Sequence, residues 1–139
     1  MIQRKLKYAV FFVILILLFV FSSFLSVPYQ MIPAENGTLN LNGQNFSERV
    51  TFKLDGQWAF YWNKLLDYSN IQHTKPDFYA NVPDTWNKYK RNGENLPGQG
   101  CATYRLHINT GVDAGTRLGL RIKTLSSAYR LYVNDELIA

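Results

Sequence analysis

Beyond residue 37, apolar side chains recur at every second position in six short segments. These segments and their apolar residues are 39–41 (Leu39, Leu41), 50–54 (Val50, Phe52, Leu54), 58–62 (Trp58, Phe60, Trp62), 104–108 (Tyr104, Leu106, Ile108), 118–122 (Leu118, Leu120, Ile122) and 129–133 (Tyr129, Leu131, Val133). A period of two is typical of half-buried β-strands, because successive side chains point to opposite faces. The pattern therefore predicts six strands, each with one face toward a core and one polar face.

Turn-forming residues separate these segments. Asp55-Gly56, the stretch from Gly111 to Gly115 and Asn134-Asp135 are typical of tight turns. Residues 84–99 are polar and rich in glycine, which predicts a long surface loop, and 63–68 could form one helical turn. Short alternating strands joined by such turns predict an all-β fold, an antiparallel β-sandwich or jelly roll.

The N-terminal segment has a different pattern. The 20 residues from Tyr8 to Val27 carry no charge, and a helix of that length spans about 30 Å, the thickness of a membrane's hydrocarbon core. Arg4, Lys5 and Lys7 precede the run, so we expect a cytoplasmic N-terminus and an exported remainder. Residues 1–27 are either a signal anchor or a cleaved signal peptide. Their length and the lack of a small-residue cleavage pattern favour the anchor.

This reading divides the chain into three parts. Residues 1–27 are the transmembrane or signal helix, 28–37 form a linker that contains two prolines, and 38–139 form the β domain. The expected location is the cell membrane, with the domain on the extracytoplasmic side. An eight-stranded sandwich needs more strands than this stretch supplies, and the chain stops directly after a predicted hairpin turn. We therefore expect the domain to be incomplete at its C-terminus.

The net charge of +5 and the pI of about 9.4 raise the possibility of a nucleic-acid partner. Three of the basic residues belong to the N-terminal segment, and without them 12 basic residues face 10 acidic ones. A domain so nearly neutral lacks the electrostatic footprint of a polyanion-binding protein, so we expect no nucleic-acid partner. Cys101 is the single cysteine, which excludes an intrachain disulfide framework.

Four motifs resemble a known family: LDGQWAFYWNKLL at 54–66, VPDTWN at 82–87, GCATYRL at 100–106 and SAYRLYVN at 127–134. The chain resembles the N-terminal extracytoplasmic galactose-binding-like jelly-roll domains of bacterial seven-transmembrane receptors with diverse intracellular signalling modules. It is also similar to the sugar-binding domain of glycoside hydrolase family 2. In both families the last of these motifs usually ends in a hairpin with the sequence Val-Asn-Gly, whereas this chain has Asp135 at the position of the glycine.

The two resemblances imply different roles. The first implies a membrane receptor's ligand-sensing module, whose transmembrane and signalling domains, such as a histidine kinase or diguanylate cyclase, would follow in a missing C-terminal part. The second implies the non-catalytic sugar-binding domain of a hydrolase. Neither resemblance identifies a ligand residue in this sequence.

The predicted loop 84–99 is the main stretch whose residues are not committed to strand faces. Its candidate ligand-binding residues are Trp86 and Tyr89 as stacking surfaces, with Asn87, Lys88, Arg91 and Asn92 as polar contacts. This combination suits a carbohydrate or another small polar ligand. Trp58 and Trp62 share a face with Phe60, so we assign them to the core.

No catalytic constellation is evident in the sequence. His73 and His107 lack metal-ligand spacing, and Asp55 and Glu94 have no feature that fixes their separation. There is no glycine-rich phosphate-binding motif. We therefore expect a protein that is not an enzyme, with no metal site and no cofactor.

The first testable prediction concerns the N-terminal segment. Expressed in a bacterial host, the chain should remain in the membrane fraction and keep its N-terminal residues, because the apolar run is long enough to span the bilayer. Membrane fractionation with N-terminal sequencing measures this. A soluble product that begins between Ser23 and Tyr29 would show that the segment is a cleaved signal peptide.

Overall fold

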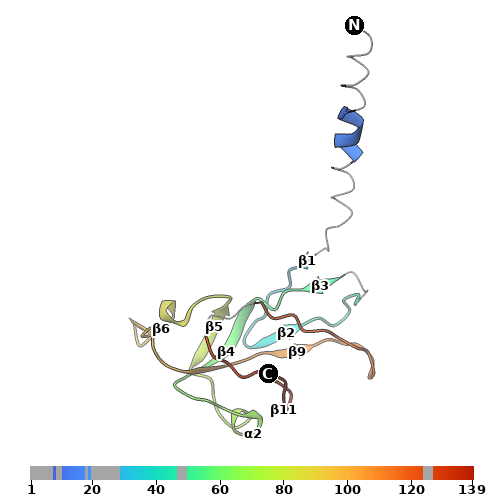
Figure 1. Ribbon diagram of the computed structural model, residues 1–139. Coiled ribbons are helices and arrows are strands. Elements are labelled where there is room, and N and C mark those ends of the chain that lie inside the picture. Colours follow the sequence, from blue (N-terminus) through green and yellow to red (C-terminus); the bar gives the residue numbers. More distant parts are fainter. Residues whose placement is uncertain (1–7, 9–10, 18, 20–28, 47–49, 124–126) are drawn as a thin grey trace.

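A computed structural model describes residues 8, 11–17, 19, 29–46, 50–123 and 127–139. Residues 8, 11–17 and 19 are helical and exposed (Figure 1). Most of the predicted anchor 1–27 lies outside the described residues. Within the described part, none of the helices combines the length and the apolar character that crossing a membrane requires.

The rest of the described chain is mostly β, which confirms the predicted class at that level. The strands are β1 (Tyr29–Gln30), β2 (Thr38–Asn40), β3 (Thr51–Phe52), β4 (Gly56–Trp62), β5 (Phe78–Val82), β6 (Lys90–Arg91), β7 (Glu94–Asn95), β8 (Ala102–Arg105), β9 (His107–Asn109), β10 (Tyr132–Val133) and β11 (Glu136–Leu137). Two short helices accompany them, α2 (Tyr68–Ile71) and the 3-10 turn η1 (Trp86–Lys88).

The strands form several small sheets, of which the largest has the order β5-β4-β8 and is antiparallel. In its register Phe60 lies opposite both Phe78 and Tyr104. The hairpins β6-β7 and β10-β11 are antiparallel, whereas β1-β3 and β2-β9 are parallel pairs. Parallel pairing was not part of the sequence prediction, and it joins segments that are distant in the chain.

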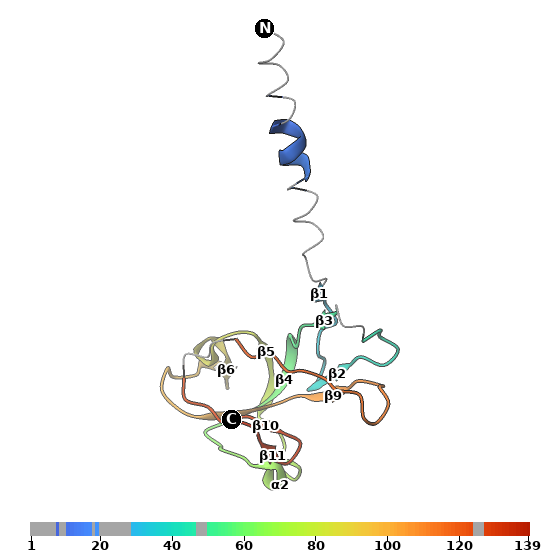
Figure 2. The same cartoon turned by 45° about the vertical axis from the view of Figure 1, so that its right-hand side comes forward.

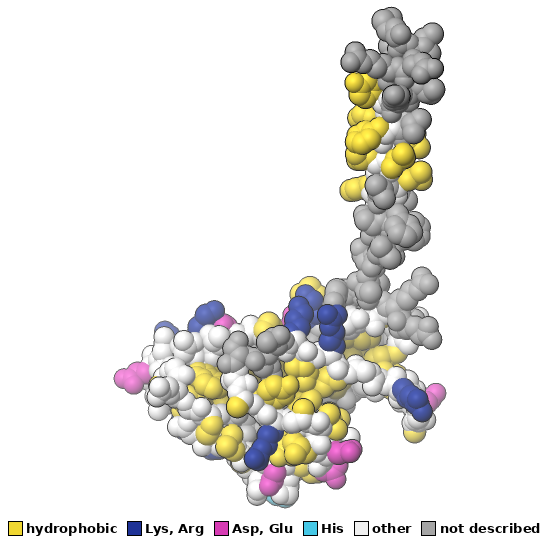
Figure 3. All heavy atoms as spheres, in the orientation of Figure 1, with side chains coloured by type: hydrophobic (Ala, Val, Ile, Leu, Met, Phe, Trp, Pro, Cys, Tyr) yellow, Lys and Arg dark blue, Asp and Glu magenta, His cyan; other side chains and the backbone are white. Residues whose placement is uncertain are grey.

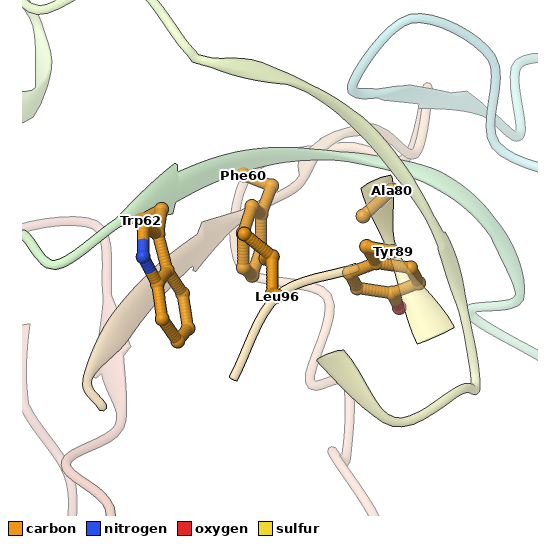
Figure 4. Packing of buried hydrophobic residues seen from close by; sticks show 5 residues of the cluster. All are labelled: Phe60, Trp62, Ala80, Tyr89 and Leu96. Carbon is orange, nitrogen blue, oxygen red and sulfur yellow. The ribbon is translucent and has the colours of Figure 1, made fainter. Parts of the chain in front are cut away.

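The central strand β4 is buried on both of its faces. Phe60 and Trp62 lie on one face with Tyr89, Leu96 and Ala80 (Figure 4). On the opposite face Ala59 and Tyr61 are equally buried, in a cluster with Ile71 of α2. The predicted core face is therefore confirmed, but the predicted polar face is wrong at Ala59 and Tyr61, because α2 covers that side.

Aromatic contacts make up most of the first core cluster. The Phe60 ring lies 4.8 Å from that of Tyr104, 4.9 Å from Phe78 and 5.4 Å from Tyr89, measured between centroids. Two of these contacts are edge-on, a geometry that aromatic quadrupoles favour. Trp58 continues the same face of β4 into a second cluster and donates its indole N–H to the Leu54 carbonyl at 2.8 Å.

The predicted linker 28–37 contributes its second half to the fold. The Ala34 N–H donates to Asp55 O (2.8 Å), and the Ala34 carbonyl accepts from Gln57 N (2.7 Å). The Gly37 N–H donates to Gln57 O, and the Gly37 carbonyl accepts from His107 N. Residues 34–37 are therefore hydrogen-bonded to both β4 and the start of β9, so they are not a free linker.

Gly56 has a role that differs from the predicted hairpin turn. It begins β4, with a φ of 120°, and forms a parallel bridge with Ala34. A Cβ at this position would collide with the backbone N and O of Ala34. The glycine is required by this close approach and by its positive φ, not by a turn between 50–54 and 58–62.

Several other local predictions differ from the structure. Residues 118–122 form no strand, and in 129–133 only β10 does. Of the helical turn expected at 63–68, only Tyr68 is helical, as the first residue of α2. The helix begins later because the Asp67 carboxylate caps it by accepting the Asn70 N–H at 2.9 Å. The turn at Asn134-Asp135 is confirmed between β10 and β11, with a φ of 57° at Asn134.

Apolar side chains remain exposed over much of the face in Figure 3. In the C-terminal part of the chain the exposed large apolar residues are Leu118, Leu120, Ile122, Tyr129, Tyr132, Val133, Leu137 and Ile138. The alternating apolar positions of the two predicted C-terminal strands are thus largely uncovered among the described residues.

The close approach at Gly56 gives the second prediction. Gly56→Ala should lower the free energy of unfolding by about 1–3 kcal/mol or more, because the added methyl group collides with the Ala34 backbone and the alanine must hold a positive φ. Urea unfolding of the detergent-solubilised chain, followed by tryptophan fluorescence, measures the change. Gly98→Ala is the matched control, because a Cβ at Gly98 meets no atom within 4 Å. Equal stability of the two variants would contradict the required close approach.

Candidate functional site

The segment 84–99 follows β5 and lies at the end of the molecule away from β2 and β9 (Figures 1 and 2). It is more ordered than the predicted surface loop, because it contains η1 and the β6-β7 hairpin. Asn92 and Gly93 occupy the hairpin turn with φ values of 54° and 87°. Positive φ at both central residues is the requirement that Asn-Gly meets best, so this dipeptide was a signal for the hairpin that the sequence prediction did not use.

Tyr89 lies between η1 and β6 and belongs to the core. Its ring is edge-on to Phe60 and Phe78, and its hydroxyl donates to the Asn81 carbonyl at 2.6 Å. Leu96 is buried beside it and donates its N–H to the Tyr89 carbonyl at 2.9 Å (Figure 4). Burial raises the pKa of the Tyr89 phenol. The prediction of Tyr89 as an exposed stacking surface is therefore wrong.

Trp86 is half-buried and lies over one end of the same core. Its ring meets Trp62 edge-on, with centroids 5.8 Å apart and planes at 68°. Because Trp62 is buried in the core, it fixes one side of the Trp86 indole while part of the ring remains exposed. Of the two predicted stacking residues, Trp86 alone retains a surface for a ligand.

The two predicted cations of this segment are held by carboxylates. Lys88 Nζ lies 2.8 Å from Asp84 Oδ1, which also accepts the Thr85 N–H. The hydrogen bonds from Lys88 and from the Thr85 backbone lower the pKa of Asp84. Arg91 lies 3.3 Å from Asp77 Oδ1, so both cations of the predicted site are already paired with acids.

Asp77 joins three separate parts of the chain. Its Oδ2 accepts the Trp62 N–H at 2.9 Å and lies 3.1 Å from Lys64 Nζ, while Oδ1 faces Arg91. Its side chain is only 11% exposed. Burial acts to raise the pKa of Asp77, but the hydrogen bonds from Lys64 and Trp62 and the charges of Lys64 and Arg91 outweigh it and lower the pKa. This carboxylate therefore fixes the β6-β7 hairpin to the end of β4.

Asn87 and Asn92 complete the predicted set, and both are exposed. Asn87 follows Trp86 within η1, whereas Asn92 is at the hairpin turn. No hydrogen bond of either amide side chain to another described residue is present. The part of the predicted site with groups available to a ligand is therefore the Trp86 ring and these amides.

A buried phenol on the opposite face of β4 was not predicted from the sequence. The Tyr61 hydroxyl has no hydrogen-bond partner among the described residues. Burial raises the pKa of Tyr61, the Arg105 charge opposes this, and Tyr79 adds to it. Tyr79 lies on β5, which the sequence analysis did not predict. The signal for this strand was the apolar residue at every second position, Phe78, Ala80 and Val82. Because Tyr61 and Trp62 are consecutive in β4, this phenol faces away from Trp86.

Other kinds of site receive little support from the described residues. A shallow hollow of about 180 Å³ is lined by Met31, Ile32, Pro33, Lys53 and Asp55, none of which is a predicted ligand residue. Its volume is below that of ordinary small-molecule sites. Within the described ranges, no group of three histidine, cysteine or acidic residues gathers that could hold a metal.

Comparison of the chain with protein-family models, with curated proteins and with solved structures gave no match. The family resemblance thus stays a prediction from the four sequence motifs.

The Asp77 contacts give the third prediction. Asp77→Asn should lower the free energy of unfolding at pH 7 by about 1–3 kcal/mol, since it removes the charge that Lys64 and Arg91 face. The folded-state pKa lies below the unfolded value of 3.8, so this stabilisation is present above about pH 4 and is lost as the pH falls through the folded pKa. Urea unfolding across pH 2.5–7 should therefore show the two proteins converging at acid pH.

Asp84→Asn is the matched control for this experiment. It also removes an acid–lysine pair, but the pair is on the surface and spans one turn of chain, so stability should change little. A loss in Asp77→Asn no larger than in Asp84→Asn, or a loss that does not vary with pH, would contradict the proposed role of Asp77.

Proposed function

We propose that residues 38–139 are a ligand-binding module of the galactose-binding-like jelly-roll type, exported and held at the membrane by residues 1–27. The ligand is a carbohydrate, and the module is the sensing part of a membrane signalling receptor whose output domain lies outside this chain. The support is the set of four motifs, the mostly β fold and the N-terminal apolar run that follows three cations. The chain itself is proposed to have no enzymatic activity.

The observation that carries the ligand-binding proposal is the partly exposed Trp86 ring. Trp62 contacts this ring edge-on and holds it in place, so ligand binding does not carry the entropy cost of ordering the Trp86 side chain. The C–H faces of sugar rings pack on aromatic surfaces, and exposed amides such as that of Asn87 donate to and accept from sugar hydroxyls. An ordered indole followed directly by the exposed amide of Asn87 suits a carbohydrate.

The charge pairing narrows the ligand class. Lys88 and Arg91 are engaged by Asp84 and Asp77, so an acidic sugar would have to compete with these carboxylates. A neutral saccharide needs no such exchange. We therefore favour a neutral carbohydrate over an acidic one.

The alternative function is that of the non-catalytic sugar-binding domain of a family 2 glycoside hydrolase, supported by the same motifs. The coding sequence beyond residue 139 separates the two. Seven hydrophobic spans followed by signalling modules would support the receptor, and an immunoglobulin-like domain followed by a catalytic barrel would support the hydrolase.

The fourth prediction tests the site itself. A screen of neutral saccharides, from galactose and glucose to their oligomers, by thermal shift on the detergent-solubilised chain should find a ligand. Trp86→Ala should then raise its Kd by roughly 5–150-fold, which corresponds to about 1–3 kcal/mol, because the stacking surface is lost. Isothermal titration calorimetry measures the affinity.

Two matched variants keep this experiment interpretable. Tyr68→Ala removes an exposed aromatic ring from α2, away from the site, and should leave Kd unchanged. Trp86→Phe keeps an aromatic surface and should restore part of the affinity. If Trp86→Ala binds the saccharide as tightly as the parent chain, the site lies elsewhere. If Trp86→Ala fails to fold, the Trp86→Phe and Asn87→Ala variants decide the question.

A further inference from the structure

Residues 117–123 have the sequence of a strand but pair with nothing that the structure describes. Their apolar positions, Leu118, Leu120 and Ile122, are 50%, 51% and 39% exposed. No backbone hydrogen bond joins this segment to another described residue. In Figures 1 and 2 its trace runs from the loop after β9 back toward β5. Although it forms no strand, it therefore resembles the open edge of a sheet, because its seven residues leave their backbone donors and acceptors unpaired within the described part of the chain.

The polar positions of the segment carry positive charge. Arg117, Arg121 and Lys123 alternate with the apolar residues, and all three are exposed. None of them has an ion-pair partner in the described part of the chain. Residues 117–123 contain no acid, and cations alternate with the apolar residues except at Gly119, which lies between Leu118 and Leu120.

Charge argues against a second copy of the same segment as the partner. An antiparallel pair must set Leu120 opposite Leu118, Leu120 or Ile122 to join the apolar faces. These registers place Arg117 opposite Arg121, Arg117 opposite Lys123, or Arg121 opposite Arg121. Like charges directly opposite one another destabilise a strand pair, and a parallel in-register pair would align every cation with itself.

We propose that 117–123 is a docking edge for an extended acidic strand, in which Asp or Glu alternates with apolar residues. Such a strand pairs its backbone with the open edge, covers Leu118, Leu120 and Ile122 with its apolar side chains, and faces Arg117, Arg121 and Lys123 with carboxylates. Backbone pairing supplies affinity in strand addition, and the alternate side chains supply specificity. This site is independent of Trp86 and of the proposed carbohydrate.

The test uses the full 139-residue chain in a neutral detergent and a fluorescent seven-residue peptide in which glutamate and valine alternate. Fluorescence anisotropy should show saturable binding, at least about ten-fold tighter than for the matched lysine–valine peptide. In the variant Arg121→Glu/Lys123→Glu the preference should reverse, so that the lysine–valine peptide binds more tightly. Hydrogen exchange of the 117–123 amides should slow at least about ten-fold when the glutamate–valine peptide is bound.

Three outcomes would overturn the proposal. A glutamate–valine peptide with proline at its centre cannot complete the ladder, so equal binding of that peptide would mean that charge alone is responsible. Sedimentation equilibrium that shows a dimer lost in the Arg121→Glu/Lys123→Glu variant would identify a second copy as the occupant. Binding of the chain to phosphatidylglycerol vesicles through 117–123, with no peptide binding, would identify a lipid surface instead.

Discussion

The burial of β4 on both faces is the constraint on which the rest of the structure depends. A strand covered on one side leaves its polar face to water, but β4 has Phe60 and Trp62 against one layer and Tyr61 against another. Both layers must therefore be supplied by distant segments. Segment 84–99 contributes Tyr89 and Leu96 to the first, and α2 contributes Ile71 to the second. The candidate site exists because covering Phe60 requires segment 84–99 to fold back and so brings Trp86 against Trp62.

For β4 the sequence predicted the buried face, because that depends on local alternation, but it predicted neither β5 nor the order β5-β4-β8. The face formed by Trp58, Phe60 and Trp62 follows from a period of two, and Phe60 and Trp62 are buried as predicted, whereas Trp58 is partly buried. The burial of Tyr61 does not follow, because tyrosine suits either environment and its cover comes from a helix that begins at Tyr68. At residues 118–122 the opposite happens, because a strand was predicted and none is present. Their alternation is strong, but alternation alone cannot provide the neighbouring strand that would make them part of a sheet.

The sequence predicted which residues belong to segment 84–99 better than it predicted which of them are exposed and which contact one another. Trp86 and Asn87 retain exposed groups, whereas Tyr89 became part of the core because its hydroxyl can reach the Asn81 carbonyl while its ring fills an apolar gap. The pairing of Lys88 with Asp84 was accessible from their spacing of four residues. The pairing of Arg91 with Asp77 was not, since it depends on how the β6-β7 hairpin folds back over the end of β4.

The bonds of residues 34–37 have a mechanical consequence. Ala34 and Gly37 form backbone hydrogen bonds with residues 55–57, and the Gly37 carbonyl also accepts the His107 N–H. One short segment is therefore hydrogen-bonded to two strands. Ala34 and Gly56 form a parallel β-bridge at this point. Tension applied along the preceding chain would then load several of these bonds together in shear, instead of opening them one after another as in an unzipping hairpin. A pull from the side of residues 31–33 is transmitted directly to β4, the part of the domain least able to yield without disturbing both layers of the core.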